Sequence, residues 1–202
     1  MSSLDVLLSD PDIVRLSSAL QTREQVQEEG EAGVRRAAVA LIFRAGADGG
    51  PELLFIKRAE YPRDPWSGQV AFPGGREEPS DHELIQTAVR ETREETGLDL
   101  AGEGKVLGML DDLRPRTFAL PAVIVRPYVV LLACRDEDLI LSPEVALAFW
   151  IPLSALRNTE SWADRRVFAR GIQVNARAFQ HEGHVIWGMT ERIIGQLLSL
   201  IA

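Results

Sequence analysis

Three glutamates and one arginine near the middle of the chain have the spacing that points most directly to chemistry. They are Arg90, Glu91, Glu94 and Glu95, which lie in the segment Arg90-Glu91-Thr92-Arg93-Glu94-Glu95. On an α-helix, about 100° per residue places Glu91, Glu94 and Glu95 within an arc of roughly 100°, with Glu91 and Glu95 one turn apart. Carboxylate oxygens arranged in this way suit Mg²⁺ or Mn²⁺.

A solvated charged helix face is the alternative interpretation of these glutamates. Like charges one turn apart cost only about 0.2–0.5 kcal/mol on an exposed helix, so repulsion alone does not exclude it. The neighbouring residues favour a site instead. Gly74 and Gly75 precede the helix and allow the backbone to pass close to a ligand. Arg90 can hold a carboxylate, and Gly97 ends the helix.

The segment from Phe72 to Leu98 resembles the Nudix box, G-x5-E-x7-R-E-U-x-E-E-x-G-U, in which U is aliphatic. Thr92 stands where an aliphatic residue is usual. One extra residue lies between the glycine and the arginine, so the upstream acidic position falls on Asp81 when counted from the glycine and on His82 when counted from the arginine. The residues that match fixed positions are Gly75, Arg90, Glu91, Glu94, Glu95, Gly97 and Leu98.

The same one-residue expansion after F-P-G-G is similar to a pattern in the coenzyme A pyrophosphatase branch of Nudix enzymes. Ile186 to Thr190, I-W-G-M-T, resembles the start of the last helix in that branch. The interval between Arg58 and Gly68 is one residue longer than in the branch, and Pro65-Trp66 stands where a histidine is usual. The upstream residues that follow the branch pattern are Leu53, Leu54, Arg58, Ala59, Arg63 and Gly68.

The resemblance implies metal-dependent hydrolysis of the diphosphate bond of coenzyme A or its thioesters, giving 3′,5′-ADP and 4′-phosphopantetheine or its acylated form. It therefore implies a small-molecule nucleoside diphosphate substrate. Two other readings stay open: a Nudix hydrolase for ADP-ribose, dinucleotides or nucleoside triphosphates, and a non-catalytic nucleotide-binding Nudix domain.

The resemblance also implies roles for the box residues. Glu91 and Glu95 would be the primary ligands of Mg²⁺ or Mn²⁺, and Glu94 a third ligand or a group behind them. Arg90 would orient a carboxylate, and the backbone of Gly74-Gly75 would shape the metal site.

Residues outside the box complete the expected site. The proton acceptor for the attacking water is either Glu95 or Glu144, which lies in Ser142-Pro143-Glu144-Val145. Arg58 and Arg63 are expected to contact substrate phosphates, including the 3′-phosphate if the substrate is coenzyme A.

The elements that position these residues follow from hydrophobic periodicity. A helix is predicted from Asp81 to Thr96, and another from about Met189 to Ile201. Asp10-Pro11 predicts the start of an N-terminal helix. Strands are predicted at 37–43, 53–57, 105–109, 122–125, 128–134, 146–151 and 184–187, and a short segment at 69–72 leads into Pro73-Gly74-Gly75. The expected fold class is α/β, a Nudix-type α/β/α sandwich with a central mixed sheet, in which residues 1–32 form a helical extension and 33–202 the catalytic domain.

The amino-acid composition argues against two classes of binding partner. The chain has 202 residues, with 30 acidic and 22 basic side chains and a formal charge of −8. Such a chain is not expected to bind nucleic acid generally or anionic membranes, because both need a basic surface. The longest apolar runs are too short to span a bilayer, so a cytoplasmic location is expected. The sequence leaves open whether the chain forms a homodimer.

Overall fold

The structure is a computed structural model that describes residues 2–28, 33–62, 64, 66–115, 122–133, 138–169 and 172–202. The helices are α1 (Ser3–Ser9), α2 (Pro11–Thr22), α3 (Leu84–Thr96), α4 (Leu100–Glu103), α5 (Leu153–Arg157) and α6 (Met189–Leu200), with a 3-10 turn η1 (Thr159–Ser161). The strands are β1 (Arg35–Ala45), β2 (Pro51–Arg58), β3 (Val70–Ala71), β4 (Gly74–Arg76), β5 (Gly104–Met109), β6 (Val123–Leu132), β7 (Val145–Pro152), β8 (Trp162–Ala169), β9 (Ile172–His181) and β10 (His184–Trp187).

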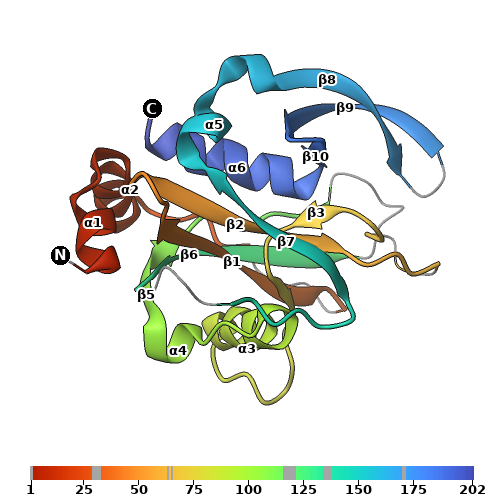
Figure 1. Cartoon of the computed structure of the whole chain (residues 1–202). Helices are drawn as coiled ribbons and strands as arrows, with labels where there is room; N and C mark the ends of the chain where they lie inside the picture. Colours follow the sequence, from red (N-terminus) through yellow and green to blue (C-terminus); the bar gives the residue numbers. More distant parts are fainter. Residues whose placement is uncertain are drawn as a thin grey trace.

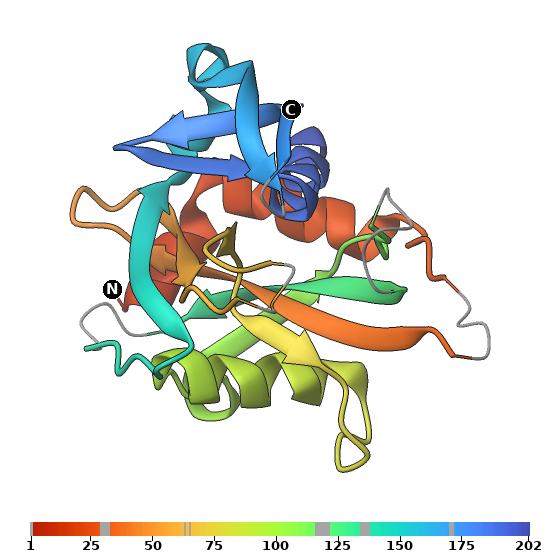
Figure 2. The same cartoon turned by 90° about the vertical axis from the view of Figure 1, so that its right-hand side faces the viewer.

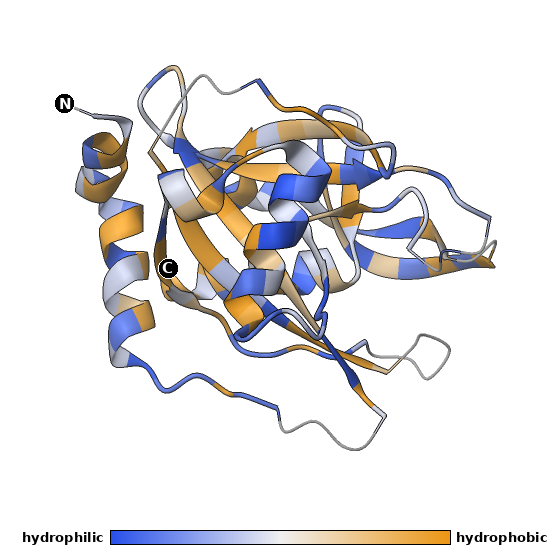
Figure 3. Ribbon diagram, turned by 90° about the horizontal axis from the view of Figure 1, so that it is seen from below, coloured by the Kyte–Doolittle hydropathy of each residue, from blue (hydrophilic) through white to orange (hydrophobic). Residues whose placement is uncertain are grey.

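Helices cover both faces of a central mixed sheet (Figure 1). Helices α3 and α4 lie on one face, while α1, α2 and α6 lie on the other, together with the small sheet of β8, β9 and β10 (Figure 2). The middle strands are hydrophobic over most of their length (Figure 3), as expected for strands that are buried on both faces. The predicted α/β/α sandwich is confirmed.

The central sheet runs in the order β3-β2-β1-β6-β5, with β4 paired to β1 and β7 paired to β2. Only the pair of β1 and β6 is parallel among the described pairings, which makes the sheet mixed. The hairpin predicted from the glycine-rich connection is confirmed, since β1 and β2 pair antiparallel with Phe43 opposite Leu53.

Proline 127 does not divide the chain into two strands, so the prediction of separate strands at 122–125 and 128–134 is wrong. One strand, β6, runs through it. The carbonyl of Pro127 accepts a hydrogen bond from the N–H of Leu110 at 2.9 Å. The register of β6 with β5 ends at Tyr128, so Pro127 lies just past the end of that ladder.

The N-terminal helices are part of the hydrophobic core. Helix α2 begins where predicted, with the side chain of Asp10 accepting hydrogen bonds from the N–H groups of Asp12 and Ile13. Hydrophobic and hydrophilic residues alternate along α2 (Figure 3). Ile13, Leu16 and Leu20 are buried, and they pack in one cluster with residues of α6 and of the central sheet.

The hairpin of β8 and β9 was not predicted from the sequence. Its strands pair from Trp162 with Phe179 to Ala169 with Ile172. Polar residues occupy both strands at adjacent positions, so the alternation that signals a half-buried strand is weak. None of the helices in the described ranges is long and apolar enough to cross a membrane.

Candidate active site

Helix α3 carries the box glutamates, and it begins three residues later than predicted. The helix was expected from Asp81, but it starts at Leu84. Asp81 stays outside because its carboxylate bonds to other groups: it accepts hydrogen bonds from the N–H of Glu78 at 2.9 Å and from the hydroxyl of Thr87 at 2.8 Å. Gln86 instead accepts from the N–H groups of His82 and Glu83, at the start of the helix.

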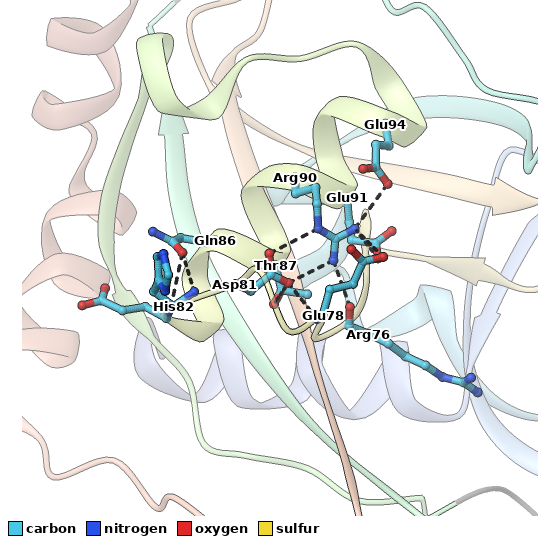
Figure 4. Close-up of polar contacts among 10 residues, drawn as sticks. Arg76, Glu78, Asp81, His82, Gln86, Thr87, Arg90, Glu91 and Glu94 are labelled. Atoms are coloured by element: carbon cyan, nitrogen blue, oxygen red, sulfur yellow. Dashed lines mark hydrogen bonds and ion pairs between the residues drawn. The ribbon is translucent and has the colours of Figure 1, made fainter.

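Asp81 and Arg90 form the centre of a polar cluster beside α3 (Figure 4). The Nε and Nη2 atoms of Arg90 donate to the two oxygens of Asp81 at 3.3 and 3.1 Å. The hydrogen bonds from Arg90 lower the pKa of Asp81 to about 2. His82 is exposed. The structure therefore places Asp81, and not His82, at the upstream acidic position that the spacing left ambiguous.

Arg90 also reaches the glutamates. Its Nη1 atom donates to Glu91 at 3.0 Å and to Glu94 at 3.3 Å, and its Nη2 atom donates to the carbonyl of Arg76 at 3.0 Å. In Figure 4 the side chain of Arg76 points away from this cluster. Arg90 thus links the loop before α3, the helix and strand β4, and it fixes the position of the Glu91 carboxylate.

Glu95 is the most deeply buried of the box glutamates, with a side chain that is 6% exposed. One carboxylate oxygen, Oε2, accepts a hydrogen bond from the N–H of Gly74 at 2.9 Å. Burial raises the pKa of Glu95 to about 7, although this hydrogen bond acts in the opposite direction. Burial also raises the pKa of Glu91. Two adjacent carboxylates with raised pKa values are a place where a cation would relieve the cost of burying negative charge.

The glycines of β4 allow these carboxylates to approach the backbone. β4 pairs antiparallel with β1, with Gly75 opposite Ala38. A Cβ atom at Gly75 would lie 2.3 Å from the carboxylate of Glu91, and one at Gly74 would lie 2.2 Å from the carbonyl oxygen of Ala38. Any side chain at Gly75 would fill the space that the Glu91 carboxylate occupies.

Glu91 and Glu95 line a cavity of about 440 Å³. Its charged lining also includes Arg58, Asp64, Arg76 and Glu144. Its apolar lining comes from β1, β6, α6 and the segment before β4; it includes Val39, Phe72, Val123, Val125, Met189 and Ile193. The cavity can therefore take a ligand that has a charged part and an uncharged part.

The box glutamates do not all face this cavity. Glu94 has a side chain that is 59% exposed, and it lies on the outer side of α3, where it bonds to Arg90. The structure brings together six of the predicted residues, which line the cavity: Arg58, Gly74, Gly75, Glu91, Glu95 and Glu144.

Glu144 enters the cavity from the loop before β7. Its carbonyl accepts a hydrogen bond from the N–H of Ala59 at 2.8 Å, and the hydroxyl of Tyr61 donates to the carbonyl of Pro143 at 3.3 Å. These bonds tie the loop to the end of β2. Burial is the largest cause of the raised pKa of Glu91 and of Glu95, and the charge of Glu144 adds to it in both.

Arg58, at the end of β2, is occupied by protein carboxylates. Its Nε and Nη2 atoms donate to one oxygen of Asp64 at 3.1 and 2.9 Å, and its Nη1 atom lies 3.8 Å from Glu95. The sequence predicted Arg58 as a phosphate contact; its side chain lines the cavity and is paired there with acidic side chains, and the phosphate contact stays a prediction. Arg63, the other predicted phosphate contact, lies outside the described residues.

Sequence reasoning missed Asp64 and most of the apolar lining. Asp64 stands in Arg63-Asp64-Pro65, where a loop carboxylate carries no pattern of its own. Residues of the apolar lining such as Val39 and Ile193 occupy positions with ordinary strand and helix periodicity, which predicts core. Only the chain fold shows that they border a cavity.

A divalent cation can be held here by two carboxylates, without a complete set of protein ligands. Among the described residues, no three His, Cys, Asp or Glu side chains are placed to hold a metal ion together. Mg²⁺ commonly binds one or two carboxylates and keeps several waters. The buried Glu95 and the half-buried Glu91, whose carboxylate lies against the backbone of Gly75, provide such an oxygen set.

Comparison with known proteins decides the family. The model of the NUDIX domain matches residues 34–171. This chain belongs to the Nudix hydrolase family. Nudix hydrolases act on pyrophosphate bonds of nucleotide-like compounds, and they generally use divalent ions such as Mg²⁺ or Mn²⁺. A relative, the uncharacterized Nudix hydrolase NudL of Yersinia pestis (strain Pestoides F), is 34% identical over 170 residues, which are 83% of this chain and 80% of that protein.

Solved Nudix structures share the fold. A MutT/nudix family protein from Enterococcus faecalis superposes with a TM-score of 0.56 at 16% identity, covering 93% of this chain and 69% of that one. A binary complex of the C. elegans Ap4A hydrolase has a TM-score of 0.50 at 23% identity, covering 60% of this chain and 82% of that one. At these identities the likeness concerns the fold alone.

Proposed function

We propose that this Nudix hydrolase cleaves the diphosphate bond of coenzyme A or its thioesters, giving 3′,5′-ADP and 4′-phosphopantetheine or its acylated form. The observation that carries the proposal is a cavity lined by two carboxylates, the half-buried Glu91 and the buried Glu95, and by a set of apolar side chains. Coenzyme A has the matching chemistry, since a diphosphate joins a charged nucleotide to a long uncharged arm. The F-P-G-G and I-W-G-M-T segments support the same choice.

In this proposal Glu91 and Glu95 hold the divalent cation. A bound cation neutralises charge on the phosphoryl oxygens and makes water a better nucleophile. Arg90 keeps the Glu91 carboxylate aimed at the cavity through the 3.0 Å hydrogen bond. The N–H of Gly74 fixes one oxygen of Glu95. Glu94 acts through Arg90, to which it is bonded at 3.3 Å.

Glu144 and Glu95 are the two groups that can accept the proton of the attacking water. Glu95 has a pKa raised to about 7 by burial, which suits a base near neutral pH, but one of its oxygens is occupied by Gly74. Glu144 is exposed, lines the cavity and belongs to a loop that is tied to the end of β2. We assign proton acceptance to Glu144 and cation binding to Glu95.

A substrate panel with Mg²⁺ and with Mn²⁺ tests the choice of substrate. The panel contains coenzyme A, an acyl-coenzyme A, ADP-ribose, diadenosine tetraphosphate and the nucleoside triphosphates, with products identified by chromatography. The proposal predicts the highest kcat/KM for coenzyme A or its thioester. A clear preference for ADP-ribose or another nucleotide would refute it. Binding of nucleotides without turnover of any of them would favour a non-catalytic domain.

A further inference from the structure

Asp64 and Arg58 form an ion pair next to the carboxylate that we assign to the cation. Asp64 Oδ2 accepts two hydrogen bonds from Arg58, at 2.9 and 3.1 Å. The remaining guanidinium nitrogen, Nη1, lies 3.8 Å from Glu95 Oε1, too far for a hydrogen bond. All three side chains line the same cavity.

The position of Asp64 is fixed by its own loop. Its Oδ1 atom accepts a hydrogen bond from the N–H of Trp66 at 3.0 Å, and its carbonyl accepts one from the N–H of Ser67 at 3.1 Å. Its N–H donates to the carbonyl of Tyr61 at 3.1 Å. The carboxylate is therefore anchored at one oxygen by the backbone and presents the other to Arg58.

The two carboxylate oxygens of Glu95 have different surroundings. Oε2 accepts a hydrogen bond from the N–H of Gly74, whereas Oε1 lies 3.8 Å from Nη1 of Arg58. A guanidinium that was not held elsewhere would close on a buried carboxylate, because a charge-assisted pair of this type shortens to about 2.7–2.9 Å. Such a contact would occupy the oxygen that a cation needs.

We propose that Asp64 is a positioning residue that holds Arg58 back from Glu95 and so keeps the Oε1 atom of Glu95 free to bind a divalent cation. The proposal rests on the assignment of Glu95 as a cation ligand under the proposed function. It gives Arg58 a role different from the phosphate contact expected from the sequence. In this proposal Arg58 competes with the cation for Glu95, and the ion pair with Asp64 restrains it.

The test is a double-mutant cycle on Asp64 and Arg58, with Mn²⁺ binding to the substrate-free protein measured by calorimetry. Asp64→Asn removes the charge that retains Arg58 but keeps the Oδ1 acceptor for Trp66. It should weaken Mn²⁺ binding about tenfold, a size typical of losing one charge-assisted contact. Adding Arg58→Met should restore the affinity to within about twofold of the Arg58→Met single variant, because no guanidinium remains to close on Glu95.

Two controls separate this mechanism from simple loop damage. Asp48 also accepts a backbone hydrogen bond two residues on, from Gly50 at 2.9 Å, in the turn between β1 and β2; Asp48→Asn should leave Mn²⁺ binding unchanged. Arg58→Met alone should bind Mn²⁺ at least as tightly as the wild type, even if Asp64→Asn proves unstable, since it removes a positive charge beside the cation.

The proposal is overturned if Asp64→Asn binds Mn²⁺ as tightly as the wild type. It is also overturned if the double variant stays as weak as Asp64→Asn, or if Arg58→Met binds more weakly than the wild type. Glu95→Gln distinguishes a failure of the underlying assignment. If Glu95→Gln binds Mn²⁺ like the wild type, Glu95 is not a ligand and both proposals fall. If it binds weakly while Asp64→Asn does not, only the positioning role is lost.

Discussion

At the scale of single residues, the interaction between Asp81 and Arg90 explains how α3 tolerates three glutamates in its last turns. The Asp81 side chain is 5% exposed and pairs with Arg90, while Glu91 and Glu94 bond to the same guanidinium. The pairing stabilises the native state while Asp81 is ionised. Because its pKa is lowered from 3.8 to about 2, this stability is complete above pH 4 and is lost as the pH falls towards 2.

Asp81→Asn should lower the free energy of unfolding by about 2 kcal/mol, the usual contribution of a hydrogen bond to a charged group. The matched control is His82→Asn, since His82 is the exposed neighbour that spacing alone could also have put in this place. It should change stability by less than about 0.5 kcal/mol. Urea unfolding at pH 7 measures both. Equal effects would mean that Asp81 is not the partner of Arg90.

Glu95 gives the metal-free protein a pH dependence of the opposite sign. Its pKa rises from 4.5 to about 7 on folding because the side chain is buried. Between these pH values the native state keeps a proton that the unfolded chain has released, so the free energy of unfolding falls as the pH rises. The effect is on the order of 3 kcal/mol at most.

Thermal unfolding in EDTA from pH 5 to pH 7.5 tests this dependence. The wild type should lose more stability across the range than Glu95→Gln, whose side chain does not titrate. Addition of Mg²⁺ should recover part of the loss at pH 7.5 in the wild type only. Parallel pH profiles for the two proteins would show that Glu95 titrates normally.

At the scale of elements, β4 is the part of the fold that makes the site specific. Gly75→Ala places a Cβ atom 2.3 Å from the flexible end of Glu91, so the carboxylate must move. We expect kcat/KM to fall about tenfold or more, as for displaced catalytic groups, with little loss of stability. Gly74→Ala meets the backbone at Ala38 instead and should destabilise the fold.

Gly195→Ala in α6 is the control, because nothing lies near the added Cβ atom and the helix should become slightly more stable. Activity assays and thermal unfolding of Gly75→Ala, Gly74→Ala and Gly195→Ala test these expectations. Full activity of Gly75→Ala would contradict the account of the Glu91 position.

The elements also show how far sequence reasoning extends. Helix α3, the β1–β2 hairpin and α6 were predicted because their hydrophobic periodicity is strong and their ends carry glycine or proline signals. The start of α3 and the strand through Pro127 were missed because tertiary hydrogen bonds, at Asp81 and at Leu110, decide them.

The residues of the candidate site also divide into those that the sequence predicted and those that it did not. The glutamates and glycines of the box were found from spacing, since a helix fixes their relative directions. Asp64 and the binding of Arg58 to it could not be found, because a loop brings them together and no repeat relates their positions. The direction of Glu94, away from the cavity, depends on its bond to Arg90.

At the scale of the whole molecule, the N-terminal segment is built into the same core as the catalytic sheet. Leu16 of α2 is fully buried. The chain after α2 is tied to the sheet, since the N–H of Val26 donates to Asp111 at 2.9 Å and that of Glu28 donates to Asp112 at 2.9 Å. Asp112 in turn accepts two hydrogen bonds of 2.8 Å from Arg126 of β6.

Leu16→Ala should therefore cost about 2–5 kcal/mol of stability for the whole protein in one cooperative transition. Val14, on the same helix, is 50% exposed, and Val14→Ala should cost less than about 1 kcal/mol. Chemical denaturation followed by tryptophan fluorescence gives both values. If Leu16→Ala were as mild as Val14→Ala, the helix would be an appendage and not part of the domain.

The net charge of the whole chain bears on how an anionic substrate would bind. The chain is acidic overall, yet the proposed substrate is an anion. Two of its carboxylates, Glu91 and Glu95, line the cavity, where a bound cation would reverse the sign of the charge that the substrate meets. Activity should consequently require a divalent ion and should disappear on chelation, in a stopped assay with EDTA.

Turnover of coenzyme A by the wild type and by Glu95→Gln, measured side by side in Mg²⁺ or Mn²⁺, tests the central claim most directly. The wild type should form 3′,5′-ADP and 4′-phosphopantetheine in equal amounts. Glu95→Gln should be slower by about 10²–10³-fold, as when one preorganised electrostatic group is removed. No cleavage of coenzyme A by the wild type, or unchanged cleavage by Glu95→Gln, would contradict the account.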